Sequence, residues 1–211
     1  MGKFNRRMTD YIKGEFQPIF LVGMSRHNLS DEVDNKQIAE DVYARKDIKI
    51  DPNSKATGFE DSFLPKTPAV DLLRKKIDNV IKSINKHLVE TGEPWAHILG
   101  PGESTMFHTH DKPGPAGLSF AYWVDFPKDS GNFVGILQVD KMRHFHEVKP
   151  KAGDLVVFPT YLPHITTRNC SEETRISISG NYYPDMNKLD EIQKDPGSLF
   201  NYVGIVNGSG G

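Results

Sequence analysis

Residues 106–111 read Met-Phe-His-Thr-His-Asp, and residues 158–164 read Phe-Pro-Thr-Tyr-Leu-Pro-His. In an extended strand, side chains two residues apart project from the same face, so His108 and His110 can grip one ion together. His164 stands much later in the chain and is suited to supply a third ligand from a distant strand. Neutral imidazoles favour iron, zinc, copper or nickel over magnesium or calcium. The three histidines therefore predict a transition-metal site assembled from separate strands.

Short apolar runs separated by Gly and Pro turns surround these histidines. This pattern predicts eight strands, at residues 95–99, 105–110, 118–125, 133–139, 144–148, 154–158, 164–167 and 174–182. Strands of this number and length are typical of a double-stranded β-helix, the jelly roll that cupins also adopt. The predicted fold class is therefore mainly β with flanking α, with one long helix packed outside the jelly roll.

The long helix is predicted just before the strands. Thr67 fits an N-cap and Pro68 the first helical position, and apolar residues then recur at helical spacing to about Glu90. Residues 1–66 look irregular, apart from an apolar run at 18–22 that favours a strand. We expect a single domain in three parts: an N-terminal extension packed on the core (1–66), a catalytic jelly roll with its N-terminal helix (67–206) and a flexible tail (207–211).

The composition restricts the possible partners. The 211 residues carry a formal charge of −2, which gives no basic excess for binding nucleic acid. No apolar run approaches the length of a membrane span. Cys170 is the only cysteine, so no internal disulfide can form, and this favours the cytoplasm. We expect a cytoplasmic protein without a nucleic-acid or membrane partner, and the oligomeric state stays open.

Arg175 stands on the last predicted strand, shortly after the third histidine. Arg175 and Ser177 share one face of that strand, while Ile176 lies on the other. A buried guanidinium without an anionic partner is costly, and its planar fork suits a carboxylate. The strand therefore predicts a small carboxylate guest, with an ion pair to an interior Asp or Glu as the alternative.

Four motifs follow one another in the chain: His108-Thr109-His110, the run Ser-Phe-Ala-Tyr-Trp-Val-Asp-Phe-Pro at 119–127, the segment from Gly153 to His164, and the segment Arg-Ile-Ser-Ile-Ser-Gly-Asn at 175–181. In this order they resemble the Fe(II)- and 2-oxoglutarate-dependent oxygenases. The closest pattern is that of a bacterial and phage branch with a His-x-His motif. The resemblance covers roughly residues 95–183.

The resemblance implies an enzyme that couples oxidative decarboxylation of 2-oxoglutarate to hydroxylation of a substrate C–H bond. Its cofactors would be Fe(II), 2-oxoglutarate and dioxygen, with ascorbate as an addition in vitro. The metal ligands would be His108, His110 and His164, and the residues at 2-oxoglutarate would be Arg175, Ser177, Tyr122 and Asn181. The family usually has an acid where His110 stands, so Asp111 is the alternative ligand.

The resemblance leaves the substrate open among small molecules, peptides and proteins. By analogy the first candidate is a prolyl residue, in the cytoplasm of a bacterial or phage-infected cell. Two other functions fit the histidines: a cupin-type metalloenzyme that does not use 2-oxoglutarate, and a non-catalytic jelly roll that binds a metal for stability.

A second histidine pair provides an internal comparison. His144 and His146 have the same spacing as the first pair but no matching distal partner, so we interpret them as part of an exposed or substrate-facing strand. His27, His87 and His97 are interpreted as surface or packing residues.

Overall fold

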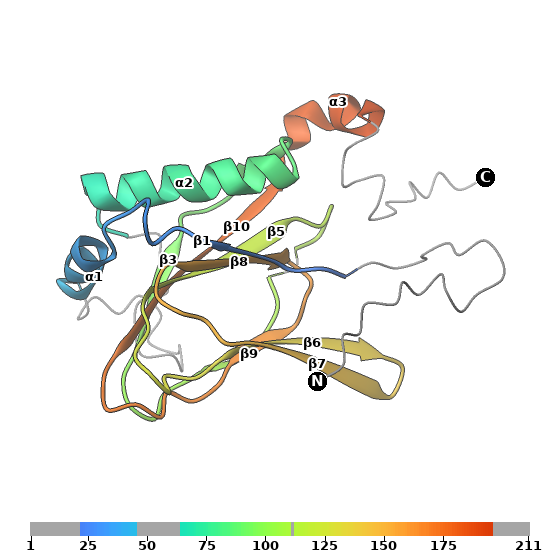
Figure 1. Ribbon diagram of the computed structural model, residues 1–211. Coiled ribbons are helices and arrows are strands. Elements are labelled where there is room, and N and C mark those ends of the chain that lie inside the picture. Colours follow the sequence, from blue (N-terminus) through green and yellow to red (C-terminus); the bar gives the residue numbers. More distant parts are fainter. Residues whose placement is uncertain (1–21, 46–63, 111, 196–211) are drawn as a thin grey trace, which may run out of the picture.

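The structure, a computed structural model, describes residues 22–45, 64–110 and 112–195 (Figure 1). Two antiparallel sheets face each other, and a helical layer covers the outer side of the larger one. The larger sheet has the order β1-β8-β5-β10-β2, with β3 also paired to β10, and the smaller has the order β4-β9-β6-β7. The predicted jelly roll is confirmed.

The elements have the following bounds. The larger sheet contains β1 (Ser25–Asn28), β2 (Leu88–Glu90), β3 (Trp95–Leu99), β5 (Leu118–Asp125), β8 (Asp154–Pro159) and β10 (Arg175–Pro184). The smaller contains β4 (Thr105–His108), β6 (Phe133–Val139), β7 (Met142–Val148) and β9 (His164–Thr166). The helices are α1 (Asn35–Tyr43), α2 (Pro68–Ile84), the short 3-10 turn η2 (Met186–Lys188) and α3 (Leu189–Lys194).

Alternation along the strands of the larger sheet separates two apolar cores. On the outer face, Tyr122 and Ile178 pack in one core with the helices, including Leu73 of α2. On the inner face, Trp123 packs with Phe133 of the smaller sheet, and their ring centroids lie 6.2 Å apart. Side chains on the inner face are therefore the ones that lie between the two sheets.

The expected irregular extension contains two regular elements that the sequence did not predict. β1 pairs along its whole length with β8, and α1 packs against β5. The α1 helix starts because the Asp34 side chain accepts a hydrogen bond from the Gln37 backbone nitrogen at 3.0 Å. It buries only Ile38 and Val42, a stripe too short to stand out as periodic. Of the strand expected at 18–22, all but Val22 lies outside the described residues, as does the tail at 207–211.

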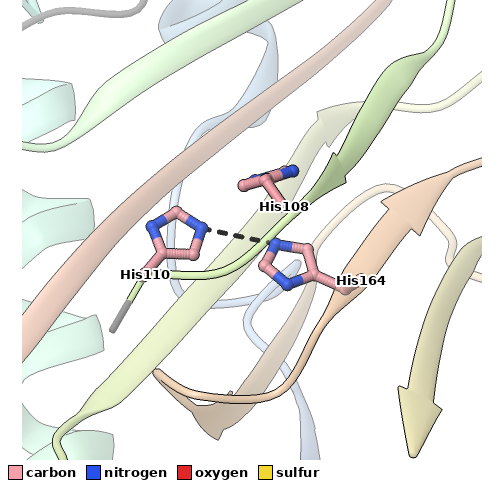
Figure 2. A group of neighbouring side chains, drawn as sticks. All are labelled: His108, His110 and His164. Carbon is pink, nitrogen blue, oxygen red and sulfur yellow. Dashed lines mark hydrogen bonds between the residues drawn. The ribbon is translucent and has the colours of Figure 1, made fainter. Parts of the chain in front are cut away.

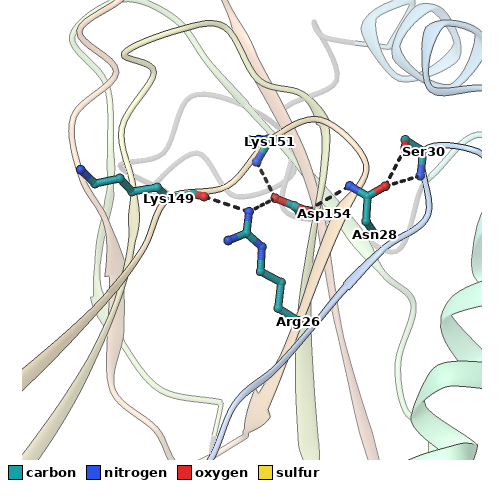
Figure 3. A network of polar contacts seen from close by, with 6 residues as sticks. All are labelled: Arg26, Asn28, Ser30, Lys149, Lys151 and Asp154. Atoms are coloured by element: carbon teal, nitrogen blue, oxygen red, sulfur yellow. Dashed lines mark hydrogen bonds and ion pairs between the residues drawn. The ribbon is translucent and has the colours of Figure 1, made fainter. Parts of the chain in front are cut away.

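The edge strand β1 is fixed by one buried carboxylate (Figure 3). Asp154, which is 3% exposed, accepts hydrogen bonds from the Arg26 guanidinium and, at 3.0 Å, from the Asn28 amide. It also accepts a bond from the Lys151 backbone nitrogen at 2.6 Å. This network satisfies the buried charge and holds β1 in register against β8.

The long helix begins as predicted but ends earlier. α2 has Thr67 as its N-cap and Pro68 as its first residue, and it ends at Ile84 rather than near Glu90. Asn85 is extended, and its side chain accepts a bond from the His87 backbone nitrogen at 3.0 Å. The chain then forms β2 against the end of β10. Leu88 is buried there as a strand residue, which is why the apolar spacing seemed to continue the helix.

All eight predicted strands are present, although β4 ends at His108 and β7 begins at Met142. No helix in the described ranges is long and apolar enough to cross a membrane.

We predict that Thr67→Ala lowers the free energy of unfolding by about 1–2 kcal/mol, because one hydroxyl makes two contacts. Thr67 Oγ1 accepts from the Val70 nitrogen at 3.3 Å and donates to Asp41 Oδ2 at 2.5 Å, which joins α1 to α2. Thr67→Ser keeps the hydroxyl and is the control. Urea unfolding measures the difference, and equal stability of the two variants would contradict this account of the cap.

Candidate metal and carboxylate site

Three imidazoles converge between the two sheets (Figure 2). His108 ends β4, His110 follows two residues later, and His164 begins β9. Their possible ligand atoms all lie within 4.8 Å of one another, and the Nε2 atoms of His110 and His164 are 3.3 Å apart. The described residues contain no other such group of histidine, cysteine or acidic side chains. The spacing is that of atoms able to share one ion.

Backbone carbonyls orient two of the three rings. His108 Nδ1 lies 2.7 Å from the Met106 carbonyl oxygen, and His164 Nδ1 lies 2.9 Å from the Leu162 carbonyl oxygen. A hydrogen bond to a carbonyl places the proton on Nδ1 and leaves Nε2 as a lone-pair donor. Burial, with His108 and His110 nearby, lowers the pKa of His164 to about 3, so the ring is neutral, as a metal ligand must be.

The segment that carries the histidine pair departs from the regular strand that was expected. β4 shifts register against β9 between Thr105 and His108, and it ends at His108. His110 is held instead by its backbone nitrogen, which donates to the Thr160 carbonyl at 2.8 Å. The two rings nevertheless lie on one side, with centroids 5.0 Å apart. Asp111, the alternative ligand, lies outside the described residues.

Arg175 begins β10 and is 1% exposed. Its Nη1 donates to the Ser130 carbonyl, and its Nη2 donates to Thr166 Oγ1 at 2.9 Å. Its Nε is buried without a hydrogen-bond partner in the described part of the chain, where no carboxylate is within ion-pair distance of the guanidinium. Burial lowers the Arg175 pKa to about 10, which leaves it charged at neutral pH. An interior cation with this environment favours an anionic guest.

The turn before β6 is shaped to receive this guanidinium. Gly131 has φ +95°, and a Cβ there would lie 2.8 Å from Arg175 Nη1 and 2.4 Å from the Thr167 carbonyl oxygen. Only glycine lets the Ser130 carbonyl approach the arginine in this conformation.

The remaining expected cofactor residues are divided between the two faces. Ser177 lies on the inner face beside Arg175, paired in register with Trp123. Asn181 is farther along the same face, where its side chain accepts from the Ser119 hydroxyl at 2.7 Å. Both remain candidates for contacts to 2-oxoglutarate.

Tyr122 requires a correction. It lies on the outer face in the helix-side core, and its hydroxyl donates to Asn35 Oδ1 of α1 at 2.5 Å. The alternation of β5 turns Trp123, not Tyr122, toward the smaller sheet. The Tyr122 hydroxyl therefore binds helix α1, and its side chain points away from the three histidines and Arg175.

Three residues that sequence reasoning did not single out lie against the site. Trp95 stacks on His110, with centroids 5.4 Å apart and an interplanar angle of 24°. The Tyr183 hydroxyl donates to the His110 carbonyl. His97, interpreted as a surface or packing residue, is 5% exposed on the inner face. Trp95 and His97 are two residues apart on one predicted strand, so the sequence indicated that they share a face. It did not indicate that this face is the inner one.

A cavity of about 400 Å³ lies against strands β6 and β7 of the smaller sheet. His164 is paired in register with Gly135 of β6, and Gly135 with His146 of β7. Neighbouring strands are about 4.8 Å apart, so His146 lies about 10 Å from His164 across a glycine. The cavity is lined by Val22, Met24, Gly135, Leu137, His144, Phe145, His146 and Leu162. The second histidine pair therefore faces a space next to the candidate metal site.

A larger cavity, of about 730 Å³, is lined by lysines and loop residues around Arg168 and Cys170. None of the three clustered histidines lines it, and its lining holds no group of metal-ligating side chains. None of the three histidines lines the smaller cavity either, but Gly135 in its lining is paired in register with His164.

Residues 93–181 match the family described as "Putative 2OG-Fe(II) oxygenase". Over this stretch the chain is similar to the 2OG-Fe(II) oxygenases. The matched stretch holds His108, His110, His164 and Arg175. This family implies Fe(II) and 2-oxoglutarate as cofactors, and the group of three imidazoles fits iron. No curated protein sequence matches the chain.

Solved structures share the fold, and two of those described below are prolyl hydroxylases. A prolyl-4-hydroxylase from Pseudomonas putida aligns with a TM-score of 0.57 and 18% identity over 77% of this chain and 93% of its own. AviO1 from Streptomyces viridochromogenes Tue57 aligns with a TM-score of 0.61 and 15% identity, over 78% of this chain and 91% of its own. A prolyl hydroxylase from Trichoplax adhaerens was solved with a hypoxia inducible factor peptide fragment. It aligns with a TM-score of 0.57 and 14% identity, over 79% of this chain and 86% of its own. At these identities the likeness concerns the fold alone.

We predict that His164→Ala weakens binding of Fe(II), measured anaerobically, by about a hundredfold or more. Losing a mere hydrogen-bond partner of a ligand already costs about 10- to 100-fold. The double variant His144→Ala/His146→Ala removes a pair of identical spacing and is the control, with affinity unchanged. Equal losses in both variants would contradict the assignment of the ion to the first group.

Proposed function

We propose that this oxygenase holds Fe(II) through His108, His110 and His164 and binds 2-oxoglutarate through Arg175. The observation that carries the proposal is the charged, buried guanidinium of Arg175, which has no carboxylate partner in the described ranges and lies on the inner face of the larger sheet, opposite the sheet that carries the imidazoles. Ser177 is the adjacent hydroxyl on that face, and Asn181 is the more distant candidate.

The donor sets fit the two cofactors. Three imidazoles suit a transition metal and leave positions for other ligands. Arg175 offers a planar charged fork of the kind that recognises carboxylates, and its Nε still lacks a partner in the described part of the chain. 2-Oxoglutarate has carboxylates at both ends, so one molecule suits both the metal and the arginine.

Iron, 2-oxoglutarate and dioxygen together supply the oxidising chemistry, and ascorbate would serve only to keep the iron reduced. The chain's residues bind and orient. Carbonyls at Met106 and Leu162 fix two ring tautomers, and Trp123 with Phe133 fills the space between the sheets with apolar side chains that exclude water. The protein's contribution is therefore a prearranged, largely dry site.

The alternatives are less well supported. A cupin-type enzyme that does not use 2-oxoglutarate, or a jelly roll with a purely structural metal, gives no reason for a buried arginine without an acidic partner. The family match does not favour either of them.

For the substrate, we propose that the cavity beside His164 admits the group to be hydroxylated. Its walls combine the apolar side chains of Met24, Leu137 and Leu162 with the imidazoles of His144 and His146. An apolar wall with a few polar groups is the usual composition of a substrate site. A prolyl residue, with an apolar ring between two amides, matches this chemistry and is our first candidate.

The cellular location and the domain organisation are also part of the proposal. The charge balance and the lone cysteine favour a cytoplasmic enzyme without a nucleic-acid partner. We also propose that residues 67–206 form the catalytic unit and that residues 1–66 pack on it as an extension, since β1 and α1 contact the jelly roll.

We predict that the protein with Fe(II), 2-oxoglutarate and dioxygen releases succinate, even uncoupled from a substrate. Arg175→Met raises the KM for 2-oxoglutarate by about a hundredfold or more, because a carboxylate loses its buried charged partner. Arg168→Met removes an exposed arginine and is the control. Tight metal binding without succinate from the wild-type protein would overturn the proposed function.

We predict that Gly135→Val stops hydroxylation of prolyl peptides while uncoupled succinate formation continues. A Cβ at Gly135 already lies 3.1 Å from Leu162 Cδ2 and 3.6 Å from the Met24 side chain, so valine fills the cavity. Mass spectrometry of the peptides and succinate assay measure the two activities. Unimpaired peptide hydroxylation by the variant would place the substrate elsewhere.

A further inference from the structure

His97 lies on the inner face of β3, within the register of the proposed carboxylate site. It is paired with Ser177, and the neighbouring pairs on the same face are Leu99 with Arg175 and Trp95 with Ser179. The ring is 5% exposed. A polar side chain at this depth normally has its hydrogen bonds satisfied.

One hydrogen bond fixes how this ring carries its proton. Trp95 Nε1 donates to His97 Nε2 at 2.9 Å, and an indole nitrogen can only donate. His97 Nε2 therefore accepts and carries no proton. Burial, with His108, Arg175 and His164 nearby, lowers the pKa of His97 to about 3, so the ring is neutral. The single proton of the neutral imidazole must then be on Nδ1.

That Nδ1–H group has no partner. The atom is fully buried, and no acceptor in the described part of the chain lies within hydrogen-bond distance. A buried donor left unpaired destabilises the folded protein. Arg175 Nε is a second buried donor in the same condition. Two unpaired donors on neighbouring rows of one face indicate a shared ligand rich in acceptors.

His97 also lies near both proposed binding groups. Electrostatic interactions connect it with Arg175, His108 and His164. A ligand that spans from the proposed metal site to the arginine would therefore lie near this ring. 2-Oxoglutarate offers only acceptor oxygens, and these suit a neutral ring whose unpaired nitrogen is a donor.

We propose that His97 is a cofactor-binding residue that donates its Nδ1–H to an oxygen of bound 2-oxoglutarate, and that Trp95 is the positioning residue for this contact. The inference rests on the proposed use of 2-oxoglutarate. It adds a neutral N–H donor to the proposed 2-oxoglutarate site, beside the charged Arg175. This donor depends on a fixed tautomer of His97.

Trp95 acts on two groups at once. Its indole nitrogen sets the His97 tautomer, and its ring stacks on His110, a proposed metal ligand. A phenylalanine in its place keeps an aromatic face for His110 but gives no hydrogen bond to His97. The two contributions are therefore separable by substitution.

The test is calorimetric titration of 2-oxoglutarate into the Fe(II)-loaded full chain without oxygen. We expect His97→Phe to weaken binding about tenfold to a hundredfold, the effect of losing one hydrogen bond to a charged group. His97→Asn retains an N–H donor and is expected to recover most of the affinity. Trp95→Phe is expected to weaken 2-oxoglutarate binding while Fe(II) affinity stays at the wild-type value.

His27→Phe removes a histidine from the edge strand β1 and is the control, with 2-oxoglutarate affinity unchanged. If wild-type protein binds 2-oxoglutarate and His97→Phe, folded and metal-loaded, binds it equally well, the role of His97 is refuted and the proposed function stands. If the Fe(II)-loaded wild-type protein does not bind 2-oxoglutarate, both are refuted.

Discussion

A guanidinium buried without a counter-charge is the constraint around which this jelly roll is arranged. Arg175 is almost completely enclosed and remains charged, and its specific partners among the described residues are two carbonyl oxygens and one hydroxyl. Leaving a buried ion in this state is expensive for a fold that could have paired it. A carboxylate ligand bound at Arg175 would offset this cost. The three imidazoles on the facing sheet are placed to contact the other end of such a ligand, through a metal ion.

Strand pairing explains how distant residues reach this arrangement. On the smaller sheet, His108 pairs with His164, His164 with Gly135, and Gly135 with His146, so one row crosses all four strands. The proposed metal ligands His108 and His164 lie at one end of the row, and the cavity-lining residues Gly135 and His146 lie at the other. On the larger sheet, the row containing His97 and Ser177 lies next to the one containing Arg175. The proposed metal and substrate sites thus lie on paired strands of the smaller sheet, and the proposed carboxylate site lies on the larger sheet that faces it.

Much of this could be predicted from the sequence, because period-two alternation and Gly or Pro turns are local signals. These signals predicted all eight core strands, and the histidines with Arg175 indicated the candidate site. Local signals do not tell which face of a strand is the inner one. Tyr122 was therefore taken for a cofactor contact, although its neighbour Trp123 has the inward position, and His97 was passed over. β1 was missed because its register depends on partners far away in the chain, and Leu88 suits a helix or a strand equally.

The most direct test is a crystal structure of the protein with Fe(II) and 2-oxoglutarate, prepared without oxygen. Anomalous scattering would locate the iron. We predict iron bound by His108, His110 and His164, with one carboxylate of 2-oxoglutarate against the Arg175 guanidinium. Iron held by Asp111 in place of His110, or an Arg175 that does not contact the cofactor, would contradict the account.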